Sequence, residues 1–76
     1  MSSDIVGVLV HARPALVDDV TTQLVEHNGV EVHATEDDGR MVVTIEGESS
    51  QVTDTIAHFT QISGVLSASL IYHHFE

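Results

Sequence analysis

Residues 30–47 read VEVHATEDDGRMVVTIEG, and this stretch decides the fold. From Val30 to Thr35 apolar and polar residues alternate, which is the period of a strand with one face in water. The pair Asp38-Gly39 is a strong signal for a tight turn, and Met41–Glu46 supplies a returning strand. The sequence therefore predicts an antiparallel β-hairpin in the middle of the chain.

A strand and a helix are predicted before this hairpin. Ile5–His11 is a short run of almost entirely apolar residues, which is typical of a strand buried on both faces. Pro14 suits the first turn of a helix, and glycine in Asn28-Gly29 favours its end. Between them, apolar residues recur at helical spacing: Leu16, Val17, Val20, Leu24 and Val25.

A second helix and a last strand are predicted after the hairpin. The pair Ser49-Ser50 offers an N-cap, and Ser63-Gly64 offers a stop. The apolar residues between them again recur every three or four positions: Val52, Ile56, Phe59 and Ile62. Val65–His73 then reads as a strand.

The predicted order is β-α-β-β-α-β, within one domain over residues 1–76. Because crossovers between parallel strands are right-handed, two such β-α-β halves interlock into a four-stranded antiparallel sheet. The expected class is α+β with a ferredoxin-like fold, strand order 4-1-3-2 and both helices on one face.

The other face of this sheet is predicted to be open. Alternation places three sets of side chains on it: Glu31/His33/Thr35, Val42/Thr44/Glu46 and Val65/Ser67/Ser69/Ile71/His73. Alternation does not orient the first strand, because both of its sets are apolar. We expect Val6, Val8 and Val10 on the open face, where they would form an apolar floor with Val42 and Ile71.

Composition excludes several partners and functions. Twelve acidic residues against two basic ones give a net charge of −10, which disfavours nucleic acids and anionic membranes. No cysteine is present, so thiolate metal sites and disulfides are excluded. No export signal or stretch of membrane-spanning length is apparent, and we expect a cytoplasmic protein that does not insert into membranes.

Catalytic and metal-binding motifs are not apparent either. The six histidines include no His-Glu-x-x-His pattern, and adjacent strand residues such as His73 and His74 point to opposite faces. No nucleophile turn, glycine-rich phosphate loop or paired-carboxylate motif is found. We therefore expect a binding module without catalytic residues, metal or cofactor.

The chain resembles the NapD family over nearly its whole length. The resemblance rests on Gly64–His74, on Gly29-Val30-Glu31-Val32, and on Asp38–Val43 leading to Ile45-Glu46. It departs from the family at Asn28, where a proline is common, and in ending soon after Tyr72-His73. NapD proteins are cytoplasmic chaperones of ferredoxin-like fold that bind the twin-arginine signal peptide of the nitrate reductase catalytic subunit, NapA.

The resemblance implies that this chain holds that signal peptide and delays export of the NapA precursor until its cofactors are loaded. The open face is where we expect the peptide to dock. The residues expected to contact it are Val6, Val8, Val10, Val42, Thr44, Ser69, Ile71 and His73. An acidic rim made of Glu31, Glu46, Asp37 and Asp38 is expected to attract the arginines of the peptide.

Two other interpretations stay open at this stage. The open face could pair with a second copy of the chain in weak self-association. The domain could also be a small-molecule-binding or dimerising regulatory module, since such modules share this topology. His11-Ala12-Arg13-Pro14 after the first strand lacks the glycine-rich loop that such modules carry there.

Overall fold

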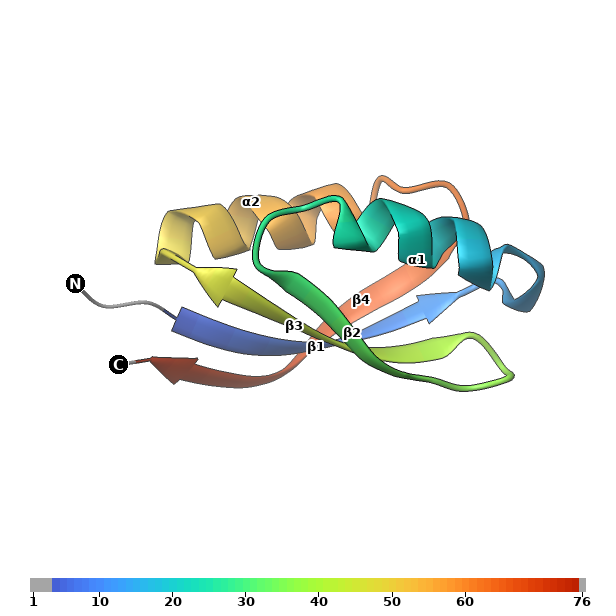
Figure 1. Ribbon diagram of the computed structural model, residues 1–76, viewed down its shortest axis with the longest axis horizontal. Coiled ribbons are helices and arrows are strands. Elements are labelled where there is room, and N and C mark those ends of the chain that lie inside the picture. The colour runs from blue at the N-terminus through green and yellow to red at the C-terminus, as the bar shows by residue number, and fades with distance from the viewer. Residues whose placement is uncertain (1–3, 76) are drawn as a thin grey trace.

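The computed structural model describes residues 4–75, which form one antiparallel sheet covered on one side by two helices (Figure 1). The elements are β1 (Asp4–Ala12), a 3-10 helix (Pro14–Leu16), α1 (Val17–Val25), β2 (Val30–Thr35), β3 (Arg40–Gly47), α2 (Ser49–Phe59) and β4 (Val65–Phe75). The strand order is β2-β3-β1-β4, so the predicted ferredoxin-like topology is confirmed.

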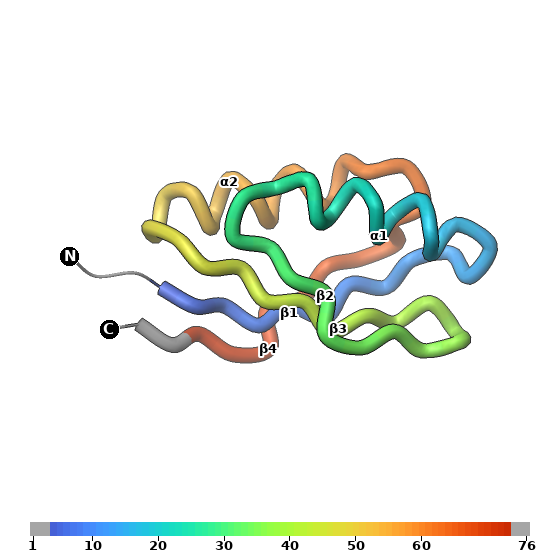
Figure 2. The backbone as a smooth tube through the Cα atoms, viewed as in Figure 1, coloured from blue at the N-terminus to red at the C-terminus, as the bar shows by residue number. Residues whose placement is uncertain are grey.

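The β2–β3 hairpin and the turn after β1 lie at the same end of the sheet (Figure 2). The backbone N–H of Ala12 donates to the carbonyl of Gly39, 2.8 Å away, and joins the two turns. Gly39 has φ +96°, a conformation that a side chain would disfavour, as the predicted tight turn requires. We call this end of the sheet the hairpin end.

The core lies between the sheet and the two helices. Its buried members are Val6, Val8, Val10 and Ala12 of β1, Met41, Val43 and Ile45 of β3, Val30 of β2, Val20 and Leu24 of α1, and Val52 and Phe59 of α2. Burying each large aliphatic side chain contributes about 1.5–3 kcal/mol to folding. This core fixes which side of each central strand faces water.

The expectation that Val6, Val8 and Val10 lie on the open face is wrong. Their exposed fractions are 2%, 0% and 0%, and they face the helices. The alternate set of β1 includes Gly7 and His11, so turning it inward would leave a void and bury an imidazole. The valines fill the helix side, and Ile5, Gly7 and Leu9 face outward.

The start of α2 also differs from expectation. Glu48 is the N-cap residue, and its backbone N–H donates to Oε1 of Gln51 at 3.4 Å. The hydroxyl of Ser49 donates instead to Oδ2 of Asp4 in β1, at 2.5 Å. Glu48 therefore takes the place of the predicted cap at Ser49-Ser50. Ser49 instead ties α2 to the first strand.

Two register shifts interrupt the pairing of β4 with β1. Gly7 pairs with Tyr72 and Val8 with Leu70, so Ile71 is an additional residue in β4. Leu66 is likewise additional, between the partners of Ala12 and His11. Each additional residue reverses the alternation that follows it.

These shifts correct three predicted orientations in β4. Val65 pairs with the buried Ala12 and packs against the core, so its expected place on the open face is wrong. His73 pairs with Val6 and therefore faces the helices, so its expected place on the open face is wrong. Tyr72, predicted to point inward, pairs with Gly7 and lies on the open face. A third shift, in β2, pairs Ala34 with Val42 and brings Ala34 to the open face as well.

Candidate functional site

The open face is the side of the sheet opposite the helices, and strand pairing arranges its side chains in four rows. From the start of β1 toward the hairpin end, the first row holds Ile5 and Glu46; the second holds Tyr72, Gly7, Thr44 and Glu31; the third holds Ser69, Leu9, Val42 and Ala34; and the fourth holds Ser67, His11 and Arg40. Successive rows lie about 7 Å apart, since each strand rises about 3.4 Å per residue.

An apolar floor occupies the middle of this face. Leu9 and Val42 face each other across β1 and β3, and both are half-buried. Ala34 of β2 and Ser69 of β4 flank them in the same row. The predicted placement of Val42, Thr44 and Ser69 on the open face is confirmed, whereas their contact with a peptide remains a prediction.

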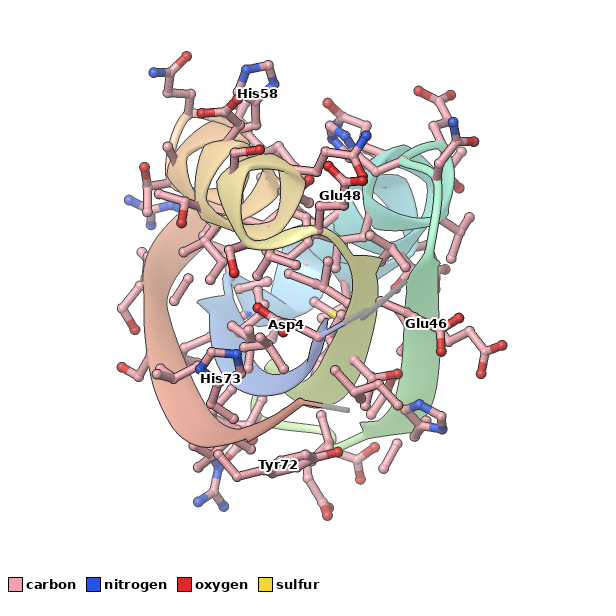
Figure 3. The ribbon with its side chains drawn as sticks, turned by 90° about the vertical axis from the view of Figure 1, so that its left-hand side faces the viewer. Asp4, Glu46, Glu48, His58, Tyr72 and His73 are labelled. Carbon is pink, nitrogen blue, oxygen red and sulfur yellow. The ribbon has the colours of Figure 1, made fainter. Side chains whose placement is uncertain are left out.

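Tyr72 lies in the second row, beside the floor, on the side of the sheet away from the helices (Figure 3). Its ring occupies the space above Gly7, where a Cβ would stand 2.1 Å from Cε1 of the tyrosine. Glycine at this position therefore lets the ring approach the backbone of the central strand. Tyr72 as a whole residue is 47% exposed, so part of it remains open to a partner.

Two carboxylates lie on this face at the end opposite the hairpin end. Glu46 is in the first row and Glu31 in the second, and both line a hollow with Ile5 and Thr44. Nε2 of His33 lies 2.6 Å from Oγ1 of Thr44 and 3.8 Å from Oε2 of Glu31. These contacts make this end of the open face acidic and rich in hydrogen-bonding groups.

The acidic rim expected from the sequence is divided between the two ends of the sheet. Asp37 and Asp38 belong to the hairpin turn, about 20 Å from Glu46 along β3 at the rise of a strand. Nε of Arg40 lies 2.8 Å from Oδ2 of Asp38. The backbone N–H of Arg40 and then its guanidinium lower the pKa of Asp38, so this carboxylate is already paired.

The remaining predicted contact residues are His73 and Ile71. Nε2 of His73 lies 3.2 Å from Oδ2 of Asp4, and Figure 3 shows the two side chains meeting on the helix side of the sheet. Ile71, at the register shift, is 51% exposed. His73 therefore contacts Asp4 on the helix side of the sheet, away from the open face. Ile71 remains a predicted contact of the peptide.

Asp4, Ser49 and His73 contain the residue types of a hydrolase triad in an arrangement unsuited to catalysis. Serine and histidine both contact the same oxygen, Oδ2 of Asp4. The hydroxyl hydrogen thus goes to the carboxylate, whereas a nucleophilic serine must give it to the imidazole. The hydrogen bond from Ser49, followed by the His73 contacts, lowers the pKa of Asp4, and the cluster joins β1, α2 and β4.

Neither a cluster of metal ligands nor a membrane-spanning helix is found among the described residues. Within residues 4–75 no three His, Asp or Glu side chains come together as metal ligands would. Neither helix of that segment has the length and hydropathy needed to cross a bilayer. The open face remains the candidate functional site.

Sequence reasoning missed Tyr72, Gly7 and Leu9 as members of the open face. A signal for the first two was present, because a glycine inside a strand often marks a close approach of another group. Leu9 was missed because the valines of β1 were expected on the open face, which would have turned Leu9 toward the helices.

Comparison with known proteins agrees with the resemblance found in the sequence. The family model described as NapD protein matches residues 3–76. Chaperone NapD of Escherichia coli strain K12 is 33% identical over 72 residues, covering 92% of this chain and 83% of that protein. Chaperone NapD of Shigella flexneri gives the same identity and the same coverage of both chains.

A solved structure agrees as well. The solution structure of the E. coli Tat proofreading chaperone protein NapD aligns with a TM-score of 0.86 and 31% sequence identity. The alignment covers 95% of this chain and 78% of that one. These homologues are named chaperones, which confirms the prediction of a non-enzymatic class. The chain belongs to the NapD family.

Proposed function

We propose that this protein binds the twin-arginine signal peptide of the NapA precursor in the cytoplasm and delays its export until cofactor loading is complete. The family relationship supports this proposal, since one solved relative is a Tat proofreading chaperone. The observation that carries it is the open face, where an apolar floor at Leu9 and Val42 adjoins the carboxylates of Glu31 and Glu46. A twin-arginine signal peptide has a basic segment followed by an apolar one, which matches both parts.

The apolar floor provides most of the affinity in this proposal. Burying one large aliphatic side chain is worth about 1.5–3 kcal/mol, whereas an exposed arginine-carboxylate pair is worth about 0.2–1 kcal/mol. The floor residues Leu9 and Val42 therefore hold the peptide. The carboxylates select and steer a cationic partner, helped by the net charge of −10.

The same net charge opposes pairing of the open face with a second copy. Two chains of charge −10 repel each other, and Glu31 and Glu46 lie on the surface that would have to meet its copy. Self-association is accordingly weak in this proposal, and peptide binding competes with it.

Calorimetric titration of the purified protein tests the proposal. A synthetic twin-arginine signal peptide from the nitrate reductase precursor is titrated beside an unrelated peptide of equal length and charge. Saturable binding to the signal peptide alone is the expected result. Equal binding to both peptides, or binding to neither, would contradict a signal-peptide chaperone.

Delay of export needs a separate measurement. Precursor and chaperone are mixed before exposure to translocation-competent membrane vesicles, and the transported fraction is followed over time. Transport is expected to slow as chaperone rises above the precursor concentration. A precursor whose signal peptide lacks both arginines but keeps its apolar segment serves as the binding control.

A further inference from the structure

The two ends of the open face differ in chemistry. The first and second rows carry Glu46, Glu31 and the ring of Tyr72. The fourth row, at the hairpin end, carries His11 and Arg40. Leu9 and Val42 lie between the two ends. The face therefore presents an acidic and aromatic end, an apolar middle, and a hairpin end where Arg40 is paired with Asp38 and lies beside Glu36.

The hairpin end carries a cation of its own on the open face. Arg40 is one of two basic residues of Lys or Arg type in the chain, and its side chain faces the same side as Leu9 and Val42. Its guanidinium already occupies the carboxylate of Asp38 at 2.8 Å. An arginine brought here would meet a like charge and find that carboxylate engaged.

At the other end, Tyr72 of β4 offers a flat surface over Gly7 of β1. Glu46 of β3 and Glu31 of β2 lie beyond it on the same face. The ring is placed by the register shift at Ile71 and by the missing side chain of Gly7. Guanidinium groups stack on aromatic faces and pair with carboxylates at the same time, which an ammonium group does less well. A ring that already lies against the sheet loses little freedom when a partner stacks on it.

We propose that the bound peptide runs in the same direction as β1, with its twin arginines over the first and second rows and its apolar segment over Leu9 and Val42. In this arrangement one guanidinium stacks on Tyr72, and Glu46 and Glu31 attract the arginines from the β3 and β2 side of the same face. The inference rests on the proposed function and deepens it by assigning the direction of the peptide and the residue that recognises arginine.

The spacing of the rows agrees with the order of segments in such a peptide. The second and third rows are about 7 Å apart, and a helix rises about 5.4 Å per turn. A helical peptide anchored by arginine at Tyr72 therefore reaches Leu9 and Val42 within one to two turns. The reversed peptide would place its arginines beside Arg40 and its apolar segment over Glu31 and Glu46.

A double-mutant cycle tests the arginine platform. Wild type, Tyr72→Leu and Tyr72→Phe are titrated with the signal peptide and with a copy in which both arginines are lysine. Tyr72→Leu should weaken binding of the arginine peptide by about three- to tenfold and of the lysine peptide by less than about twofold. Tyr72→Phe keeps the ring and should keep the preference for arginine over lysine.

Leu70→Ala is the matched control for this cycle. Leu70 lies on the same strand and is 58% exposed, but it faces the helix side beside α2. The control should bind both peptides as the wild type does. Equal losses of the two peptides in Tyr72→Leu would overturn the role of the ring.

The direction is tested by a nitroxide label on the amino end of the signal peptide, read by the broadening of backbone amide signals of the chaperone. Stronger broadening at Ile5 and Glu46 than at His11 and Arg40 is expected. The opposite pattern would overturn the proposed direction while leaving signal-peptide binding intact. Failure of the wild type to bind the peptide at all would overturn the proposed function and this inference together.

Discussion

The two faces of β1 both carry apolar side chains, and they are buried to different extents. On the helix side, Val6, Val8 and Val10 are sealed in the core. On the open side, Ile5 and Leu9 stay half-buried, and only Gly7 is covered, by the ring of Tyr72. The core accounts for the first set, whereas the second exceeds what the fold needs, which is the usual sign of a surface that meets a partner.

The largest expected effect comes from a charge on the sealed side. Val8→Asp would bury a carboxylate without a partner and cost about 4 kcal/mol or more, against a typical total stability of about 5–15 kcal/mol. Circular dichroism and thermal melting should show a largely unfolded or severely destabilised protein. A native spectrum with an unchanged melt would place Val8 on the open face after all.

The same substitution one residue along the strand should affect binding in preference to folding. Leu9→Asp stays folded with a loss of about 1 kcal/mol, the span of strand preferences. Its affinity for the signal peptide should fall more than about tenfold, since one aliphatic contact worth about 1.5–3 kcal/mol is lost. Titration calorimetry on a sample checked by circular dichroism measures both, and intact affinity would exclude the third row from the site.

A smaller effect is expected at Gly7, which lies on the open face under the ring of Tyr72. Gly7→Ala would push its methyl group into the ring of Tyr72 and cost about 1–3 kcal/mol in urea denaturation. In a Tyr72→Ala background the same change should be neutral or stabilising, because glycine inside a strand is unfavourable by about 0.5–1 kcal/mol. Additive effects in this double-mutant cycle would show that the ring does not rest on Gly7 in solution.

The smallest effect is expected at acidic pH, where Asp4 loses the charge that holds its contacts with Ser49 and His73. Since the pKa of Asp4 is lowered below its ordinary value of 3.8 by folding, the carboxylate stabilises the protein above that value. This stabilisation is lost as pH falls through the folded-state pKa. Melting temperatures measured from neutral pH downward should show Asp4→Asn less stable than wild type, with the gap closing below pH 3.8.

Ser49→Ala is the matched variant for this measurement. The hydrogen bond from Ser49 is the largest cause of the lowered pKa, so its removal should move the acid loss of stability to higher pH. A Ser49→Ala melt that follows wild type at every pH would contradict the cluster.

The sequence predicted the elements and their order because each depended on local signals. The Asp38-Gly39 turn, the helix periodicity and the apolar alternation of β3 each agree with the structure. The faces of β1 were not predictable from alternation, since both sets are apolar. Packing decides between them, because the other orientation would leave a void at Gly7 and bury the imidazole of His11.

The orientation of β4 failed for a different reason. Alternation holds only while pairing is regular, and the additional residues Leu66 and Ile71 reverse it. Neither residue differs in type from its apolar neighbours, so no local signal announces the shifts. Tyr72 and His73 consequently exchanged faces relative to expectation, and with them the aromatic member of the candidate site.

These shifts also bear on how the chain avoids fibre formation. β4 is an edge strand, and from Val65 to Tyr72 it carries no charge and no proline, the usual guards against adding further strands. Leu66 and Ile71 break its ladder, which leaves two short uninterrupted stretches, Ser67–Leu70 and Tyr72–Phe75. A segment this short is a poor template for stacking, so the irregularities that bring Tyr72 to the open face also protect the edge from aggregation.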